Sequence, residues 1–263
     1  MTPGSNPGAP TNLEIMRKKI LLIVAILIIL IAIYLNRSYA HIYQKIGDAA
    51  LKSSDQNQTY VLGYGISSEN TTYVAMGDSL TAGVGVDNYE KSFPFLIAES
   101  FAASGVDVIL KDRAFPGFRT ADLKGDLLEK VIKDKPGVIT ILIGVNDIHG
   151  LVKKTDFKNN YEAILKRLTS ETKAKIYVVG IPFIGGTDLL QFPYNFYFDW
   201  QTKKFNEVIK NLADTYQVKY IDLYSQTVDE FKKEGDHYAA DSFHPSEKGY
   251  AEWAKIIYAG INQ

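Results

Sequence analysis

Apolar and polar positions divide the chain into four parts. Residues 1–16 are rich in Pro, Gly, Asn and Thr and have the composition of a disordered tail. Residues 20–35 form an uninterrupted apolar run without a charge, a glycine or a proline, and a polar, mixed stretch follows up to about residue 70. From residue 71 onward short apolar runs alternate with amphipathic segments, which predicts a folded domain over residues 71–263.

The apolar run predicts a single transmembrane helix over residues 17–36. At about 1.5 Å per residue the run spans roughly 24 Å, slightly less than the roughly 30 Å of a bilayer core, and flanking Lys and Arg side chains can make up the difference. Three basic residues precede the run and only Arg37 follows it closely. The positive-inside rule therefore predicts a cytoplasmic N-terminus and an extracytoplasmic domain.

A cleaved signal peptide is the alternative interpretation of the same run. Ser38-Tyr39-Ala40 fits a small-x-small cleavage site, and cleavage there would secrete the protein. A retained anchor is favoured because the run is long for a signal peptide and neither Tyr34 nor Leu35 interrupts it. Residues 37–70 are then expected to form an extracytoplasmic arm, in which residues 41–51 have the pattern of a short helix continuing out of the membrane.

The alternation of strand-like and helical patterns predicts an α/β domain. Short apolar runs are typical of buried parallel strands, and βα units of this size predict a parallel sheet covered by helices on both faces. The last helical segment carries apolar residues at helical spacing and is expected to pack on the sheet. The predicted strands are 73–76, 106–110, 138–143, 175–181 and 219–222, and the predicted helices are about 93–104, 120–133, 156–169, 200–216 and 246–261.

Composition narrows the classes of function. Hydrophobic residues make up 46% of the chain and charged residues 22%, which indicates a packed core rather than global disorder. The net charge of −1 does not point to nucleic acid. The chain has no cysteine, which excludes disulfides, thiolate nucleophiles and Cys-ligated zinc, and the spacing of its four histidines gives little support for a three-His metal site. Neither a GxGxxG nor a GxxxxGK phosphate loop occurs.

Four polar stretches follow predicted strands or precede the last helix. Because ligands in open α/β sheets gather at the carboxyl ends of the strands, we expect these stretches to converge at one edge of the sheet. Each one alone is also compatible with an ordinary turn, since Gly, Asp and Ser are common turn residues. The stretches are Gly77-Asp78-Ser79-Leu80, residues 113–120, Gly144-Val145-Asn146-Asp147 and Asp241-Ser242-Phe243-His244-Pro245.

These stretches contain the parts that a serine nucleophile needs. The hydroxyl of Ser79 requires a base, for which His244 is the candidate, and the base requires an acid to hold its tautomer, for which Asp241 is the candidate. Acyl transfer also needs donors aimed at the oxyanion, and the backbone N–H groups of Ser79 and Gly117 and the side-chain amide of Asn146 are the candidates. A side chain at Gly117 would crowd an incoming substrate.

In their order and spacing the four stretches resemble the sequence blocks of the SGNH (GDSL) hydrolase family, over about three-quarters of the chain. Residues 77–80 resemble the first block, Gly117 the second, residues 144–147 the third and residues 241–245 the fifth. The resemblance implies a three-layer α/β/α sandwich with a five-stranded parallel sheet of the flavodoxin-like type. It does not imply the α/β-hydrolase fold, because the chain has no Gly-x-Ser-x-Gly elbow and the serine follows the first strand of the domain.

The resemblance also implies the roles of individual residues. Ser79, His244 and Asp241 would form a catalytic triad, and Ser79, Gly117 and Asn146 an oxyanion hole. No metal and no organic cofactor would be needed. The expected partners are the ester substrate and the membrane, through residues 17–36, without nucleic acid.

The implied function is a serine esterase that hydrolyses carboxylic esters through an acyl-enzyme intermediate. Acyl or lipid esters and lysophospholipids fit the family. The alternative is an O-acetyl esterase or an acyltransferase that acts on cell-envelope glycans, because hydrolysis and transfer share the acyl-enzyme step. A non-catalytic carbohydrate-binding domain is less favoured, since every member of the implied triad and oxyanion hole is present.

Other polar residues near these stretches have mainly structural interpretations. His237 is the rival base, but it lies in a hydrophilic segment and is expected to be solvated. His149 follows Asn146 closely and is a candidate for the pocket lining. Asp78 and Asp147 are expected to hold turns through backbone hydrogen bonds.

Two features beside the expected site have open interpretations. Arg113 and Arg119 flank Gly117 and are expected at the surface, with contact to an anionic substrate as the alternative. Residues 182–198 follow the fourth predicted strand and contain many aromatic residues but no Lys or Arg. They are expected to form either a packed loop over the core or a lid or acyl-pocket wall that touches the bilayer, where Tyr and Phe are favoured.

Overall fold

A mixed six-stranded sheet forms the centre of the domain. The computed structural model describes residues 11–48, 57–63, 65, 70–183, 185–186, 189–233 and 235–263. The strand order is β1-β3-β2-β4-β5-β6, in which β1 runs antiparallel to β3 and every other pair is parallel. The strands are β1 (Thr59–Leu62), β2 (Asn70–Gly77), β3 (Asp107–Ala114), β4 (Val138–Leu142), β5 (Lys175–Val179) and β6 (Lys219–Ile221).

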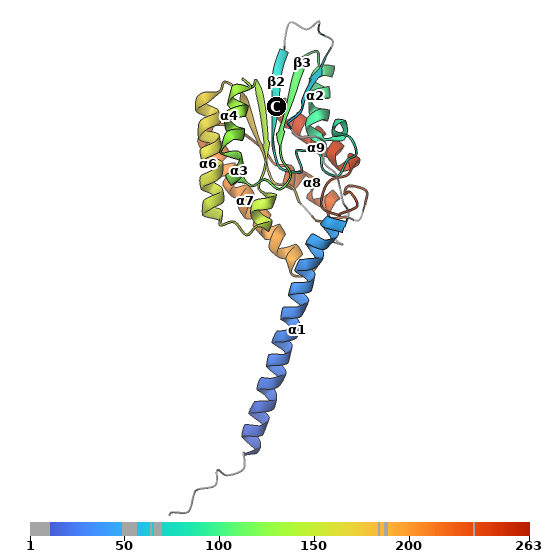
Figure 1. Cartoon of the computed structure of the whole chain (residues 1–263), viewed down its shortest axis with the longest axis vertical. Coiled ribbons are helices and arrows are strands. Elements are labelled where there is room, and N and C mark those ends of the chain that lie inside the picture. The colour runs from blue at the N-terminus through green and yellow to red at the C-terminus, as the bar shows by residue number, and fades with distance from the viewer. Residues whose placement is uncertain are drawn as a thin grey trace, which may run out of the picture.

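Helices cover both faces of this sheet, which gives the three layers that the sequence predicts (Figure 1). One layer consists of α2 (Phe93–Ala103), α8 (Leu223–Phe231) and α9 (Glu247–Ile261). The other consists of α3 (Thr120–Leu123), α4 (Asp126–Lys133), α6 (Lys154–Glu171) and α7 (Tyr194–Tyr216), with the short α5 (Val145–His149) beside α7. A long helix, α1 (Asn12–Asp48), extends away from the domain, and a single 3₁₀ turn, η1 (Tyr89–Lys91), precedes α2.

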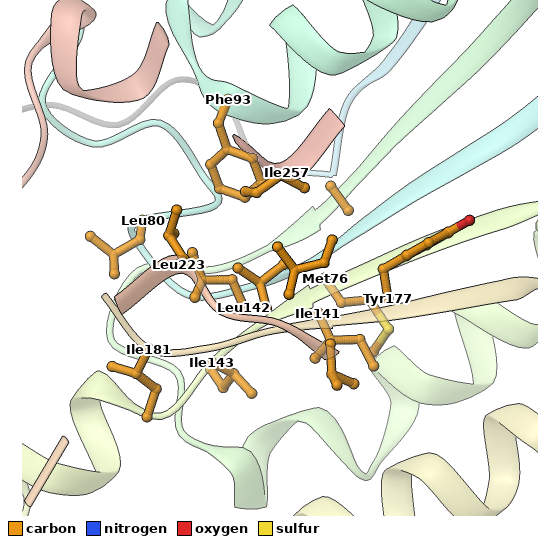
Figure 2. Close-up of a cluster of buried hydrophobic side chains, with 14 of the residues drawn as sticks. Met76, Leu80, Phe93, Ile141, Leu142, Ile143, Tyr177, Ile181, Leu223 and Ile257 are labelled. Atoms are coloured by element: carbon orange, nitrogen blue, oxygen red, sulfur yellow. The ribbon is translucent and has the colours of Figure 1, made fainter. Parts of the chain in front are cut away.

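The central strands are apolar along their length because both faces of the sheet are covered. Every residue of β4 is buried, and so are the residues of β2 from Tyr73 to Gly77. In Figure 2, Phe93 of α2 lies beside Ile257 of α9, above the strands that carry Met76 and Leu142. This core holds the parallel strands together with their carboxyl ends at one edge.

The prediction of a five-stranded, wholly parallel sheet is wrong by one strand. β1 lies within residues 37–70, which were expected to form an arm, and its positions alternate between exposed and half-buried, with Val61 80% exposed. Four residues at a sheet edge give only a weak strand signal in a sequence. The ring of Tyr60 attaches β1 to the domain, because it stacks on Tyr89 at 5.1 Å and meets the edge of Phe95 at 5.4 Å.

The predicted helices are present with shifted boundaries. The helix expected over residues 120–133 is divided into α3 and α4 at Gly125, the N-cap residue of α4. α7 begins at Tyr194, earlier than the expected residue 200, so the end of the aromatic segment belongs to this helix. The short helices α5 and α8 were not predicted.

α1 begins inside the expected tail and continues into the expected arm. It is long and apolar enough to cross a membrane, which suggests a signal sequence or a membrane anchor. The side chains of its apolar run are exposed up to Tyr34, whereas Leu35 is half-buried, Ser38 is buried and Ile42 belongs to the core of the domain. The C-terminal part of α1, from the end of the apolar run onward, therefore packs on the domain, while the rest of the run does not.

Candidate active site

Ser79 lies in a tight turn directly after the carboxyl end of β2. The carbonyl oxygen of Asp78 accepts hydrogen bonds from the N–H groups of Thr81 and Ala82, at 3.1 and 2.9 Å, and the carbonyl oxygen of Ser79 accepts one from Val84 at 3.0 Å. These bonds close the turn and present the Ser79 side chain at the edge of the sheet.

Gly77 is required by close packing at the end of β2 and not by an unusual backbone angle. It is not among the residues with a positive φ, and it is the last residue of β2. A Cβ atom at this position would overlap with the carbonyl oxygen of Leu142 and the side chain of Thr81. Gly77 therefore allows the end of β2 to lie against β4 and the serine turn to fold back onto the strand.

Asp241 and His244 lie in the loop that precedes α9. One carboxylate oxygen of Asp241, Oδ1, accepts the backbone N–H groups of Phe243 and His244, each at 2.9 Å. Ser242 adopts a left-handed φ of 56°, and its carbonyl oxygen accepts the N–H of Gly186 at 2.8 Å. This local bonding leaves the second carboxylate oxygen, Oδ2, to face the His244 ring.

The structure joins Ser79, His244 and Asp241 in a continuous hydrogen-bonded series. His244 Nε2 lies 2.9 Å from Ser79 Oγ, and His244 Nδ1 lies 2.5 Å from Asp241 Oδ2. An ionised carboxylate can only accept, so Nδ1 carries the proton and Nε2 offers its lone pair to the serine hydroxyl. Asp241 is fully buried, and Ser79 and His244 are each 6% exposed.

The charge on Asp241 follows from its surroundings. Burial by itself would raise the pKa of this carboxyl, but the hydrogen bond and charge of His244, together with the N–H groups of Phe243 and His244, outweigh burial and hold the pKa below its ordinary value. Asp241 is therefore a carboxylate at neutral pH and can stabilise positive charge that develops on the ring beside it.

Gly117 lies on the loop that follows β3, and Asn146 lies in α5, just after β4; β3 and β4 are the two strands on either side of β2. Gly117 has a φ of 83°, a conformation that favours glycine, and no atom lies within 4 Å of the place where a Cβ would stand. Asn146 donates one amide hydrogen to the carbonyl oxygen of Phe118 at 3.0 Å, and a primary amide has a second hydrogen to donate. Both residues thus flank the serine turn.

Hydrogen bonds also tie these loops to one another. The N–H of Phe115 donates to the carbonyl oxygen of Gly77 at 3.2 Å. Asp147 accepts the backbone N–H of Thr120 at 3.0 Å and its hydroxyl at 2.6 Å. Asp147 therefore joins α5 to the start of α3, and the expectation that it holds its own turn is wrong.

Asp78 holds its turn as predicted, because its Oδ1 accepts the N–H of Leu80 at 3.0 Å. Its other carboxylate oxygen is buried without a hydrogen-bond partner in the described part of the chain. Burial, with a smaller contribution from the nearby charge of Asp147, raises the pKa of Asp78 to about 7.

His149 lies in an aromatic wall beside the triad. Its ring stacks on Phe198 with centroids 4.2 Å apart and meets the edge of Phe243 at 5.4 Å. The ring of Phe243 in turn lies 4.9 Å from the ring of His244. Burial lowers the pKa of His149 to about 4, so this ring is neutral. We had not singled out Phe198 or Phe243 from the sequence, although both lie inside stretches that we had singled out.

The expectation that His237 is solvated is wrong. This side chain is buried, its ring centroid lies 5.1 Å from that of Phe231, and its Nε2 lies 3.4 Å from a carboxylate oxygen of Glu252. The charged neighbours of His237 in the sequence mislead because the loop folds onto α8 and α9. The structure brings His244, not His237, to the serine.

The two arginines differ from each other. Arg113 is buried in β3, where its Nε donates to Asp134 at 2.8 Å and its guanidinium also donates to the carbonyl oxygen of Asp112 at 2.9 Å. The expectation of a surface arginine is therefore wrong for Arg113. Arg119 is exposed, as expected, and its guanidinium lies close to Gly150.

The aromatic segment 182–198, of which residues 184, 187 and 188 lie outside the described residues, contacts α1. The hydroxyl of Tyr34 donates to the carbonyl oxygen of Phe192 at 2.8 Å. The hydroxyl of Tyr194 donates to the carbonyl oxygen of Leu35 at 3.1 Å. Ser38 donates to the side chain of Gln191 at 3.3 Å. A sequence signal for this contact exists, because residues 34, 38 and 42 are spaced four apart and so share one face of a helix.

The arrangement is suited to nucleophilic attack by a serine. A hydroxyl, an imidazole ring and a buried carboxylate are aligned for proton transfer, and hydrogen-bond donors lie on the segments that follow the neighbouring strands. Within the described residues no cluster of three or more His, Asp or Glu side chains could hold a metal ion.

Solved structures with the same fold include several esterases. The acetylxylan esterase Axe2 from Geobacillus stearothermophilus superposes with a TM-score of 0.60 at 18% identity, covering 77% of this chain and 96% of its own. The esterase EstA from Pseudoalteromonas sp. superposes with a TM-score of 0.60 at 19% identity, covering 73% and 97%. The lipase/acylhydrolase from Enterococcus faecalis superposes with a TM-score of 0.60 at 24% identity, covering 73% and 95%.

Sequence comparison leads to the same group. No curated protein shows significant similarity to the chain. The model of the GDSL-like lipase/acylhydrolase family matches residues 75–252, which is more than half of the chain and includes all four polar stretches. The chain therefore belongs to the GDSL-like lipase/acylhydrolase (SGNH) family and is a carboxylic ester hydrolase.

Proposed function

We propose that the chain is a membrane-anchored serine esterase in which Ser79 is the nucleophile, His244 the general base and Asp241 the residue that orients it. The observation that carries this proposal is the series of hydrogen bonds from Ser79 Oγ through His244 to Asp241, at 2.9 and 2.5 Å. A serine hydroxyl becomes an effective nucleophile when an adjacent base of fixed tautomer removes its proton.

Acylation begins when Ser79 Oγ attacks the ester carbonyl carbon and its proton passes to His244 Nε2. The carbonyl oxygen becomes an oxyanion, which accepts hydrogen bonds from the N–H groups of Ser79 and Gly117 and from the second amide hydrogen of Asn146. The bond to the alkoxy oxygen then breaks, and that oxygen takes the proton from His244. The alcohol leaves, and the acyl group remains on Ser79.

Deacylation repeats these steps with water as the nucleophile. His244 accepts a proton from water, whose oxygen attacks the acyl carbon, and then returns a proton to Ser79 Oγ as the carboxylic acid leaves. Asp241 stabilises the imidazolium in both halves of the reaction. A sugar hydroxyl in the place of water would give an acyltransferase by the same route.

A retained anchor with a cytoplasmic N-terminus is supported by the way α1 meets the domain. Tyr34 and Ser38 make hydrogen bonds to residues 191–192, and cleavage after Ala40 would remove these contacts. The basic residues before the apolar run support the orientation. The N-terminal sequence of the protein in purified membranes tests this point, since a chain that starts after Ala40 would contradict it.

Acyl or lipid esters, including lysophospholipids, are the substrate class that we favour. An anchored site stays close to lipid, and Phe243, which packs against the ring of His244, makes the surroundings of the triad apolar. The alternative class is O-acetyl groups on cell-envelope glycans, with hydrolysis or transfer of the acetyl group. The likeness to the acetylxylan esterase Axe2 favours that alternative.

Hydrolysis of p-nitrophenyl esters by the full chain in detergent micelles tests the proposal. Acetate, butyrate, octanoate and palmitate are compared, with Ser79→Ala as the control. We expect activity that depends on Ser79, with an optimum at the longer acyl chains. An optimum at acetate, with acetate released from or moved between O-acetylated glycans, would favour the alternative. Folded protein without Ser79-dependent activity on any ester would contradict the proposed function.

A further inference from the structure

Exposed large hydrophobic side chains of the catalytic domain gather at the start of α7. After α1, and among the described residues, such side chains are exposed at Val61, Ile109 and Leu151 and at four positions between residues 192 and 200. Of these four, Phe192 is 64% exposed, Phe196 67% and Trp200 54%. Exposed aromatic residues in a cluster mark a surface that contacts another apolar phase.

Three of these rings form one stripe, which we call the aromatic stripe: Phe192, Phe196 and Trp200. Phe196 and Trp200 lie four residues apart on α7 and so share one face of that helix. The ring centroids of Phe192 and Phe196 are 6.1 Å apart. Residues 189–198 contain no charged side chain. The stripe ends at Lys204, whose Nζ lies 5.9 Å from the centre of the Trp200 ring.

The position of the stripe relative to α1 identifies its partner. The hydrogen bonds of Tyr34 to Phe192 and of Tyr194 to Leu35 place the start of α7 beside the residues that end the apolar run. In Figure 1 the lower end of α7 meets α1 where α1 reaches the domain. Aromatic rings followed by a lysine are the composition that proteins present at the level of lipid headgroups.

We propose that the aromatic stripe docks the catalytic domain on the surface of the bilayer that α1 crosses. This inference rests on the retained anchor proposed above, and it adds a second contact between the protein and the membrane. Tyr34 and Leu35 stand where the hydrocarbon layer ends, Phe192 and Phe196 enter the interface, and Trp200 lies in the headgroup layer with Lys204 beside anionic lipid.

Docking in this way turns the reactive edge of the sheet toward the lipid. α1 contacts the loops that follow the carboxyl ends of β4 and β5, since Tyr43 donates to the carbonyl oxygen of His149 at 3.4 Å and Ser38 contacts Gln191. Ser79 lies at the same edge, after β2. Esters held in the bilayer surface would therefore reach the serine without leaving the membrane.

The chain carries its own fluorescent probe for this docking. It has two tryptophans, of which Trp253 is buried in the core and Trp200 belongs to the stripe. The full chain is reconstituted in nanodiscs of phosphatidylcholine and phosphatidylglycerol, with either plain acyl chains or acyl chains brominated near the headgroup or near the chain end. Bromine quenches tryptophan only at short range.

We expect brominated lipid to quench the native protein, more strongly with bromine near the headgroup. The matched control, Trp200→Phe, retains only Trp253 and should be unaffected. Phe196→Trp in the Trp200→Phe background should restore quenching, and more strongly, because residue 196 lies closer to α1. The docking proposal fails if the chain enters the nanodiscs but neither Trp200 nor a tryptophan at position 196 is quenched.

Other outcomes distinguish a failure of the docking from a failure of the anchor or of the proposed chemistry. Loss of the chain from the nanodiscs would overturn the anchor and the docking together. Unquenched emission with dimers that Phe196→Ser dissociates would assign the stripe to a second copy of the chain and overturn the docking. Ester hydrolysis in the same samples reports separately on the proposed chemistry, so that a failure of catalysis is not mistaken for a failure of docking.

Discussion

The triad and the aromatic stripe are organised in opposite ways. The triad joins Ser79 and His244, which are 165 positions apart, whereas the three rings of the stripe lie close together in the sequence, at residues 192, 196 and 200. At the triad the polar side chains are buried and hydrogen-bonded to one another. At the stripe the aromatic rings are exposed. The comparison suggests that the polar groups of the triad find all their partners within the chain. The rings of the stripe are instead buried only when they meet another phase, such as a bilayer.

Removal of the proposed nucleophile should have the largest effect on the first region. Ser79→Ala leaves the serine turn intact, because its hydrogen bonds involve backbone atoms. We expect kcat for p-nitrophenyl esters to fall at least about a thousandfold. Circular dichroism should be unchanged. Retention of a tenth of the activity or more would break the assignment of Ser79.

Replacement of Asp241, the proposed orienting acid, should have the next largest effect. Asp241→Asn can still accept the N–H groups of Phe243 and His244, but its neutral amide no longer holds the proton on His244 Nδ1. We expect a loss of about 10³- to 10⁴-fold in kcat. The exposed Asp236→Asn, which loses a contact with Lys248, is the matched control and should retain activity. Equal losses in the two variants would show that the effect is not specific to the triad.

Loss of Asn146, a proposed oxyanion donor, should have a smaller effect on kcat. Asn146→Ala removes the amide that is partly used on the Phe118 carbonyl oxygen. We expect kcat to fall about 10²- to 10³-fold, with little change in KM, because the bond is made in the transition state. Asn159→Ala, on the exposed face of α6, is the control. A rise in KM at constant kcat would instead indicate a role in substrate binding.

Disruption of the stripe should affect only substrates held in a membrane. We expect the Phe196→Ser, Trp200→Ser double variant to lose activity severalfold on lipid esters in nanodiscs and to keep its activity on p-nitrophenyl acetate. Val61→Ser removes an exposed hydrophobic side chain from β1, away from the stripe, and should change neither activity. Equal losses on both substrates would show that the stripe supports the catalytic domain itself.

The smallest effect concerns stability at the serine turn. Burial raises the pKa of Asp78 to about 7, above the ordinary value of 3.8 that applies in the unfolded chain. The folded state then binds more protons between these values, so Asp78 makes the protein less stable as pH rises from about 4 to 7. We expect Asp78→Asn, which can still accept the Leu80 N–H, to reduce this decline in melting temperature. An identical pH dependence in both proteins would contradict the assignment.

The features that the sequence predicted depend on local pattern. The buried strands are continuous apolar runs, and the residues of the triad lie in short stretches whose turns are closed by their own neighbours, as in the loop from Asp241 to His244. Their position after parallel strands then brings them to one edge. The catalytic roles of Ser79, His244, Asp241, Gly117 and Asn146 and the division of the chain into domains remain predictions.

The features that the sequence did not predict depend on distant contacts. β1 is held by its pairing with β3 and by the rings of Tyr89 and Phe95, and its own four residues give only a weak strand signal. His237 is buried because Phe231 comes to lie beside it. The docking of α1 on residues 191–194 likewise requires the folded α7. Truncation at residue 70, which the expected arm would permit, would remove β1 and α1 together.

Covalent capture of the nucleophile tests the central claim most directly. The full chain is treated with a p-nitrophenyl alkylphosphonate, which traps a serine activated by a neighbouring histidine, and is then analysed by peptide mass spectrometry. The account predicts a single adduct on the peptide that contains Ser79, absent from Ser79→Ala and strongly reduced in His244→Ala. An adduct on another residue, or no adduct on folded protein, would contradict it.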